Sequence, residues 1–336
     1  MKTTEKLKKT AGCALLLLAA LILPLVIQTV YNQNVLILMM VYAVLGSGWN
    51  VLSGYAGQNS FGNAMFFAIG AYTSTVLLLY FNITPWIGMI VGVILAVIFA
   101  ALIGIPCFRL QKYYFTLATI ALLQIMNVLV SKQRFLDGAV GLNIRVRESS
   151  FFWMQFKGKL PFYYIILGIL IIVLIVMHYV NRSKLGYYLR TITMNQDAAE
   201  SLGVSVRTYK TIAICLGAAF TAVGGTFYAQ YVLFVDPVSI ISADKSMLMA
   251  LVAVFGGMGT IWGPVIGACI LIPIAEYSRT LIGGTGSGID MIVYGLLMLI
   301  MVLYQPRGMI GIFSKIRARF AKPENNAGGR EEHHEQ

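Results

Sequence analysis

Between Lys9 and Arg109 the sequence contains no Asp, Glu, Lys, Arg or His. A water-soluble fold needs charge on its surface, and soluble domains carry about 25% charged residues. In this chain charged residues make up 11% and apolar residues 58%. Helices that cross a bilayer need about 20 apolar residues each and disfavour charge in their middle. The long uncharged stretch therefore predicts an all-α, polytopic membrane protein.

Apolar runs predict about ten membrane-entering helices, some of them broken or re-entrant. The expected single spans are residues 11–30, 34–53, 61–80, 86–108, 114–130, 161–180, 210–233 and 289–304. Residues 246–280 are too long for one span and contain "FGGMGTIWGP", so we expect two segments, the first about half as deep as the bilayer. The first apolar run lacks a cleavage site, which favours an uncleaved span.

Basic residues set the orientation, because short cytoplasmic loops are enriched in Lys and Arg. Alternating the spans puts residues 1–10 and a polar connector, 181–209, on the cytoplasmic side. The connector and the start of the next span carry Arg182, Lys184, Arg190, Arg207 and Lys210. The transmembrane domain is then 11–313, and 314–336 is a basic amphipathic stretch on membrane lipid followed by a disordered tail.

This topology predicts a multi-pass protein of a bacterial cytoplasmic membrane with both termini inside. It also accounts for the net charge of +12 without a nucleic-acid partner. One loop departs from the pattern, because residues 131–160 fall outside yet are basic. Either hydrophobicity outweighs the charge bias, or the loop docks an acidic extracytoplasmic partner. The docking candidates are Arg134, Arg145 and Arg147.

Two polar, glycine-rich islands interrupt the apolar spans. The first contains Asn50, Ser53, Gln58, Asn59, Ser60 and Asn63 with Gly54, Gly57 and Gly62. The second contains Gly256, Gly257, Gly259, Thr260, Gly263 and Pro264. Glycine alone would fit tight helix packing, but irregular backbone with amides and hydroxyls is tolerated at depth only beside protein or water. We therefore expect paired helix breaks beside a polar substrate path.

Few ionisable residues fall inside the spans, which argues against a proton- or sodium-driven carrier. No phosphate-binding loop for ATP is present. The spans contain no paired His, Cys or carboxylate cluster, so we predict no enzyme activity, no metal site and no cofactor. Cys13, Cys107, Cys215 and Cys269 show no metal-binding spacing. A gated channel or facilitator remains an alternative to a driven transporter.

The connector contains a short polar helix within "LRTITMNQDAAESLGVSV", residues 189–206. Its predicted features are an Asn195 N-cap, acidic Asp197 and Glu200 near the positive helix end, a Gly203 stop, and an apolar face of Ala198, Ala199 and Leu202. This face suits a socket in another protein. An ordinary amphipathic loop helix is the other interpretation.

In order along the chain stand "LSGYAGQNSFGNAMFFAIGAY", "KYYFTLATIALLQI", "DGAVGL", "NQDAAESLGVSVRTYK", "FYAQYVLFVDP", "VFGGMGTIWGPVIGA" and "YQPRGMIGIF". With these segments residues 30–313 resemble the branched-chain amino acid ABC transporter permeases, in the type with the longer external loop. The resemblance implies a second, homologous permease, two ATP-binding cassette ATPases and an extracytoplasmic substrate-binding protein. It also implies that residues 195–203 form the coupling helix that contacts an ATPase.

The chain departs from this family after "TLA", where members often carry Glu and, three residues later, Arg. Gln124 and Asn127 occupy these positions here. The substitution keeps this helix neutral, and we include both residues in the expected substrate path. It also leaves the cargo open between branched-chain amino acids and urea or short amides.

Overall fold

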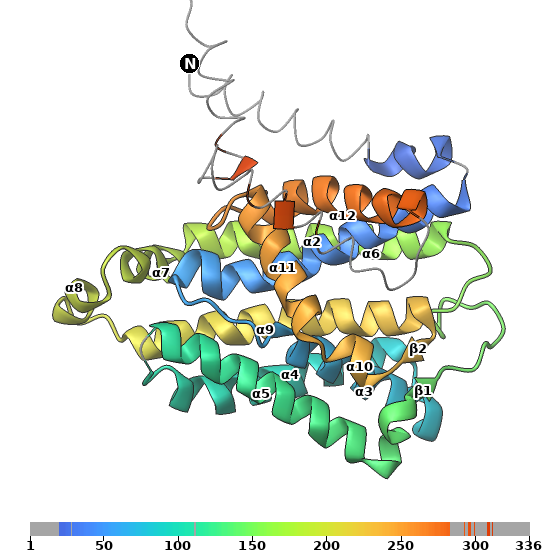
Figure 1. Ribbon diagram of the computed structural model, residues 1–336, viewed down its shortest axis with the longest axis horizontal. Helices are drawn as coiled ribbons and strands as arrows, with labels where there is room; N and C mark the ends of the chain where they lie inside the picture. Colours follow the sequence, from blue (N-terminus) through green and yellow to red (C-terminus); the bar gives the residue numbers. More distant parts are fainter. Residues whose placement is uncertain are drawn as a thin grey trace, which may run out of the picture.

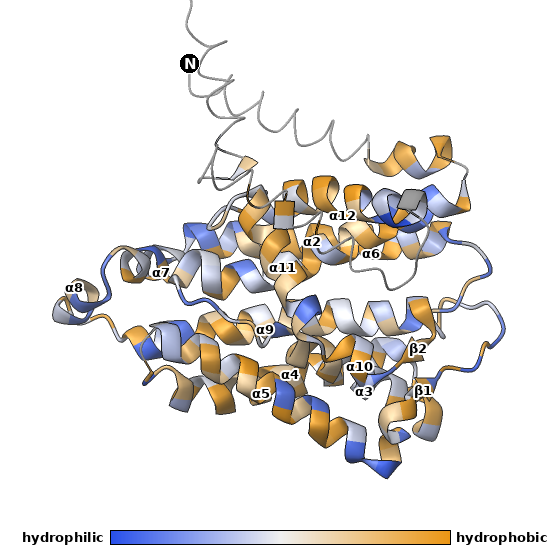
Figure 2. Cartoon of the chain, viewed as in Figure 1, coloured by the Kyte–Doolittle hydropathy of each residue, from blue (hydrophilic) through white to orange (hydrophobic). Residues whose placement is uncertain are grey.

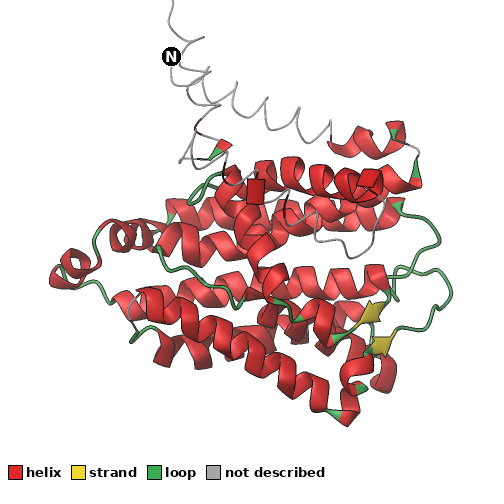
Figure 3. Cartoon of the chain, in the orientation of Figure 1, coloured by secondary structure: helices red, strands yellow, loops and turns green. Residues whose placement is uncertain are grey.

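The structure, a computed structural model, describes residues 20–27, 29–110 and 112–282, together with positions 292, 295, 296, 299, 308, 309 and 311. Within them the fold is almost entirely helical (Figures 1 and 3). Most of the expected first and last spans and the tail 314–336 lie outside the described residues.

Eight long helices carry the fold. They are α2 (Val30–Ala56), α3 (Asn63–Phe81), α4 (Pro85–Cys107), α5 (Lys112–Lys132), α6 (Leu160–Arg182), α9 (Val206–Val232), α11 (Ala243–Gly256) and α12 (Gly263–Ile282). The short elements in the described residues are the 3-10 helices η1 (Arg134–Leu136) and η2 (Gly138–Val140), α7 (Lys184–Met194), α8 (Gln196–Ser201), α10 (Pro237–Ile240), β1 (Leu142–Asn143) and β2 (Phe234–Val235).

Seven helical stretches in the described residues are long and apolar enough to cross a membrane. They are α2, α3, α4, residues 113–132 of α5, α6, α9 and residues 237–256, which join α10 to α11. The all-α, polytopic prediction is confirmed. The predicted division of 246–280 is also present, because α11 ends at Gly256 and α12 begins at Gly263. With 14 residues, α11 is about 21 Å long, shorter than a bilayer core of about 30 Å.

The connector and the external loop lie at opposite ends of the bundle. Figure 1 shows α7 and α8 projecting from one end, while the β1–β2 ribbon lies at the other. The ribbon, which the sequence did not predict, is antiparallel and pairs Leu142 with Val235 and Asn143 with Phe234. Figure 2 shows polar residues in the connector and the loops, and apolar residues along the long helices. The placement of the connector on the cytoplasmic side and of residues 131–160, the external loop, on the outer side stays a prediction.

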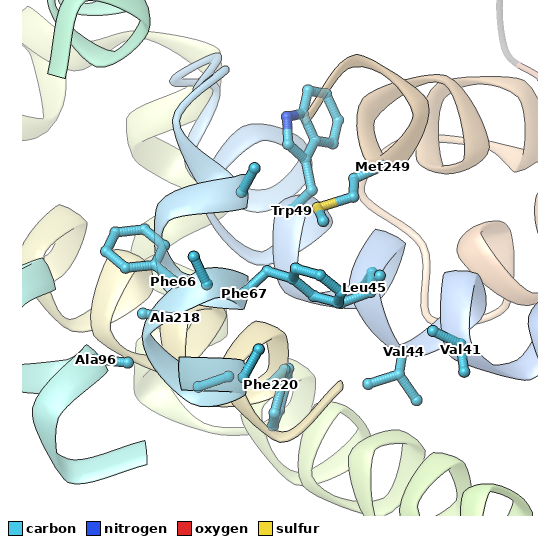
Figure 4. Close-up of a cluster of buried hydrophobic side chains, with 14 of the residues drawn as sticks. Val41, Val44, Leu45, Trp49, Phe66, Phe67, Ala96, Ala218, Phe220 and Met249 are labelled. Carbon is cyan, nitrogen blue, oxygen red and sulfur yellow. The ribbon is translucent and has the colours of Figure 1, made fainter. Parts of the chain in front are cut away.

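Helix α9 runs through the centre of the bundle and packs against α2, α3 and α4. Figure 4 shows Phe67 beside Leu45 in the buried cluster that also contains Ala218 and Phe220 of α9. The α3–α9 contact is made through backbone, because an added Cβ at Gly70 would lie 2.1 Å from the carbonyl oxygen of Ala222. Small residues permit such close approach where helices associate in a membrane.

Helix α5 is the least buried of the seven stretches. It carries large exposed side chains along its outer surface, including Tyr113, Leu117, Val128 and Leu129. In a membrane protein such a surface faces lipid or another subunit. α5 thus lies at the edge of this chain's bundle.

Candidate functional site

Residues 57–62, the first break, are a non-helical segment between the end of α2 and the start of α3. Gly57 ends α2 with φ 66°. The indole Nε1 of Trp49 donates to the Ser60 carbonyl at 2.6 Å, and the Phe61 N–H donates to Thr119 Oγ1 at 3.2 Å. Trp49 and Thr119 each lie seven residues from the nearby helix end, which is about 10 Å at 1.5 Å per residue. The first break therefore rises about 10 Å into the bundle before α3 starts.

Residues 257–262, the second break, contact α2 at Asn50, which lies six residues before the helix ends at Ala56. The carboxamide of Asn50 bridges to them, because its Nδ2 donates to the Thr260 carbonyl at 2.8 Å and its Oδ1 accepts from the Gly259 N–H at 2.9 Å. Gly257 and Gly259 have φ values of 131° and 71°, which glycine adopts without strain. The two polar islands, 209 residues apart in this contact, thus form one site.

The predicted helix-breaking residues fall at the expected places with one exception. Gly62 precedes α3, Gly256 ends α11, and Gly263 and Pro264 open α12. Gly54 does not break a helix, because it lies inside α2. An added Cβ there would lie 2.5 Å from the Gly259 nitrogen. Gly54 therefore permits close approach of the second break and does not interrupt α2.

Four of the nine predicted polar residues bind the backbone of the breaks through their side chains: Asn50, Ser53, Ser60 and Thr260. Ser53 Oγ donates to the Gln58 carbonyl at 3.1 Å and accepts from the Ser60 N–H at 3.3 Å. Thr260 Oγ1 donates to the Gly257 carbonyl at 2.6 Å. Asn63, at the start of α3, is buried. These bonds satisfy irregular backbone that lies at membrane depth. Contact of these side chains with cargo stays a prediction.

A hollow of about 220 Å³ opens beside the first break. Its lining is mostly apolar and comes from the end of α2, the first break, α11 and the second break: Trp49, Asn59, Phe61, Met247, Ala250, Leu251, Val254 and Met258. Asn59 is exposed, unlike the neighbouring Gln58 and Ser60. The site therefore presents an apolar wall with one carboxamide beside it.

Gln124 and Asn127, the two residues of α5 that depart from the family pattern, have different surroundings. Asn127 Nδ2 donates to the carbonyl oxygens of Pro237 and Ile241 at 3.2 and 2.9 Å, which ties α5 to α10. Gln124 is exposed on the surface of α5. Asn127 thus has a packing role that its sequence position did not indicate.

The connector forms the predicted short helix, α8. Asn195 Oδ1 accepts from the Asp197 and Ala198 N–H groups, each at 3.1 Å, so the N-cap is confirmed. Gly203 has the expected positive φ, 82°. The predicted apolar face is wrong at Ala199, which is fully buried in a cluster with Ile192 and Val206. The connector folds back on itself, and this places Ala199 inside.

The exposed side of α8 consists of other predicted residues. Leu202 is 79% exposed, and Asp197, Ala198 and Glu200 are exposed as well. Met194, just before the cap, is also exposed. These residues project at the end of the bundle where α7 and α8 extend (Figure 1).

Lys210 is the residue whose role the sequence concealed. Its place among the basic residues of the connector predicts an exposed side chain, yet it is only 5% exposed. Its Nζ donates to Gln58 Oε1 at 2.9 Å and to Gln196 Oε1 at 2.8 Å. The available signal was its position: Lys210 lies four residues after the start of α9, inside a long apolar helix and not in the polar connector. Lys210 joins the connector to the first break.

One of the basic residues of the external loop, Arg147, makes its contacts within this chain. Arg147 donates to Asn82 Oδ1 at 2.6 Å and lies 4.3 Å from the Trp153 ring centroid. Arg134 and Arg145 are exposed. Desolvation lowers the pKa of Lys159, at the start of α6. Arg145 and Arg147 also line a surface hollow of about 430 Å³ at this end.

A lysine near the start of α11, which the sequence patterns did not single out, lies against aromatic rings. The Lys245 ammonium is 4.4 Å from the Tyr228 ring centroid and 4.9 Å from that of Phe67. Aromatic faces attract a cation in this geometry. The "ADKS" preceding the apolar run was the available signal. Among the described residues no cluster of His, Cys, Asp or Glu is arranged to hold a metal ion.

Comparison with known proteins gives one family. Residues 31–302 match the family described as the permease component of branched-chain amino acid transport systems. The chain is similar to the high-affinity branched-chain amino acid transport system permease protein LivM of Escherichia coli, with 27% identity over 296 residues, 81% of this chain and 68% of that protein.

Two further relatives are named for different transported compounds, branched-chain amino acids and nucleosides. The chain is 24% identical over 285 residues to the permease protein LivH of Escherichia coli, covering 80% of this chain and 91% of LivH. It is 25% identical over 214 residues to the nucleoside ABC transporter permease protein NupC of Lactococcus lactis, covering 59% and 65%. No solved structure matches the chain.

Proposed function

Because the chain belongs to the family of permease components of branched-chain amino acid transport systems, we propose that it is a permease subunit of an ABC importer for branched-chain or related amino acids. The observation that carries the proposal is the pair of helix breaks that both bind α2 beside the apolar hollow. Discontinuous helices near mid-membrane are the usual setting of a transporter's substrate site. ATP hydrolysis in this proposal belongs to partner subunits.

The proposed assembly contains a second permease, two ATP-binding cassette ATPases and an extracytoplasmic binding protein. Similarity to both LivM and LivH supports a pair of related permeases. The exposed side of α8 is the proposed ATPase contact, and the external loop, with exposed Arg134 and Arg145, is the proposed docking surface. The protein would lie in a bacterial cytoplasmic membrane with the connector and both termini inside.

The hollow supports an apolar cargo. Trp49, Phe61 and the methionines Met247 and Met258 offer an adaptable surface for a branched aliphatic side chain, while Asn59 offers a hydrogen-bonding group. An affinity set mainly by the binding protein requires only weak interactions along this path. Gln124 and the similarity to a nucleoside permease keep urea, short amides and other polar solutes as cargo to be tested.

The test is reconstitution into proteoliposomes of the chain with its partner permease, both ATPases and the binding protein. We expect uptake of branched-chain amino acids that requires ATP and binding protein and that persists with a protonophore. Passive, bidirectional flux through this chain alone would select a gated channel. Uptake of urea or amides in preference to amino acids would correct the cargo.

A further inference from the structure

The side chain of Lys210 connects the connector to the first break. Gln58, which accepts from its ammonium at 2.9 Å, is the second residue of the first break and is 2% exposed. Gln196, which accepts at 2.8 Å, is the first residue of α8. In the sequence, Lys210 lies 152 positions from Gln58 and 14 positions from Gln196. A single ammonium group thus binds both parts.

A buried ammonium is a demanding connection. Lysine has three donors, and burial of its charge is tolerated only when hydrogen bonds replace its hydration. Both bonds described for Lys210 go to neutral carboxamide oxygens, and hydrogen bonds with a charged donor are stronger than neutral ones. Movement of either carboxamide away from Lys210 therefore carries a larger penalty than loss of an exposed contact.

Gln58 depends on this bond. Its Nε2 is buried and has no hydrogen-bond partner among the described residues. Loss of the Lys210 bond would leave Oε1 without its partner as well, so that neither polar atom of this buried carboxamide would be hydrogen-bonded, which is costly. The first break would then have to rearrange.

A second contact holds the connector against the same place. Thr193 Oγ1, near the end of α7, donates to the Tyr55 carbonyl at 2.6 Å, and Tyr55 lies in the last turn of α2. Thr193 also packs against Gly57, since an added Cβ there would lie 3.2 Å from its Cγ2. α8 is therefore fixed to the first break through Lys210, and α7 is fixed to the end of α2 through Thr193.

We propose that Lys210 is the positioning residue that transmits displacement of α8 to the first break, by holding Gln196 and Gln58 together. When α8 moves, Gln58 and the start of α3 move with it, and the hollow beside them changes. This inference rests on the proposed function for the identity of the force that moves α8. It adds the atoms through which that force reaches the substrate path.

The experiment compares Lys210→Met, Lys210→Arg and Arg207→Met in the complete reconstituted transporter. Arg207 is the control, because it is exposed one turn before Lys210 on the same helix. We expect Lys210→Met to keep both ATPases bound and hydrolysing ATP, while uptake per ATP falls roughly tenfold or more with loss of the charged donor. Lys210→Arg should recover part of the ratio, and Arg207→Met should match the unaltered protein. An unchanged ratio in Lys210→Met overturns the proposal.

A double-mutant cycle protects the test against a folding defect at Lys210. Gln58→Met and Gln196→Met each remove one bond, and Gln196 is only partly buried. If Lys210 couples them, the double variant should lose little more uptake per ATP than one single variant. Additive losses reject the link. ATP-independent uptake by the unaltered assembly would instead reject the proposed function, so the two failures are distinguishable.

Discussion

At the level of single residues, one carboxamide ties α2 to the second break. Asn50 is 1% exposed and binds the backbone of Gly259 and Thr260. We expect Asn50→Leu to lower the free energy of unfolding by about 1–3 kcal/mol for each backbone group left unpaired. Thermal unfolding in detergent measures this loss. Gln124→Leu, which replaces an exposed carboxamide, should leave the unfolding midpoint unchanged or raise it, and equal midpoints for both variants would contradict the assigned role of Asn50.

At the level of elements, the connector shows what sequence patterns reach and what they miss. The cap at Asn195 and the stop at Gly203 were predictable, because they depend on neighbouring backbone. The burial of Ala199 was not, because it depends on how Ile192 and Val206 fold around α8. Likewise, a single sequence cannot reveal that Lys210 meets Gln58, 152 positions away. For the six expected spans from 34–53 to 210–233, the observed helices in the described residues end within about four residues of the prediction, since these positions follow from local hydrophobicity.

The same element carries a sharper test of the ATPase contact. We expect Leu202→Arg to weaken binding of the ATPases and to reduce uptake while membrane insertion stays intact, because Leu202 is 79% exposed. Ala199→Arg should instead destabilise the connector, since its charge would enter the buried cluster. Co-purification of the ATPases and protease sensitivity of the connector separate the two effects. Normal ATPase binding by Leu202→Arg, with the same uptake as an exposed Thr208→Arg control, would place the contact elsewhere.

At the level of the whole molecule, the external loop and α8 lie at opposite ends (Figure 1). Substitutions in the external loop should therefore change the docking of an acidic binding protein without changing the assembly of the ATPases. We expect Arg134→Glu with Arg145→Glu to raise the KM for binding protein several-fold, and salt to weaken docking because charges are screened beyond about 8 Å at physiological ionic strength. Uptake at graded binding-protein concentrations measures this KM. A KM insensitive to both salt and charge reversal would favour the other interpretation, in which hydrophobicity merely outweighed the charge bias.

The close backbone contact of α3 with α9 restricts how the chain can alternate its access. An added Cβ at Gly225 would lie 2.0 Å from the Phe67 carbonyl oxygen, and one at Gly92 of α4 would lie 3.2 Å from the Gly70 Cα. Helices meshed at this spacing resist sliding, so α3, α4 and α9 should pivot as one rigid lever. Opening and closing of the pathway would then be a movement of this whole lever against the helices packed beside it.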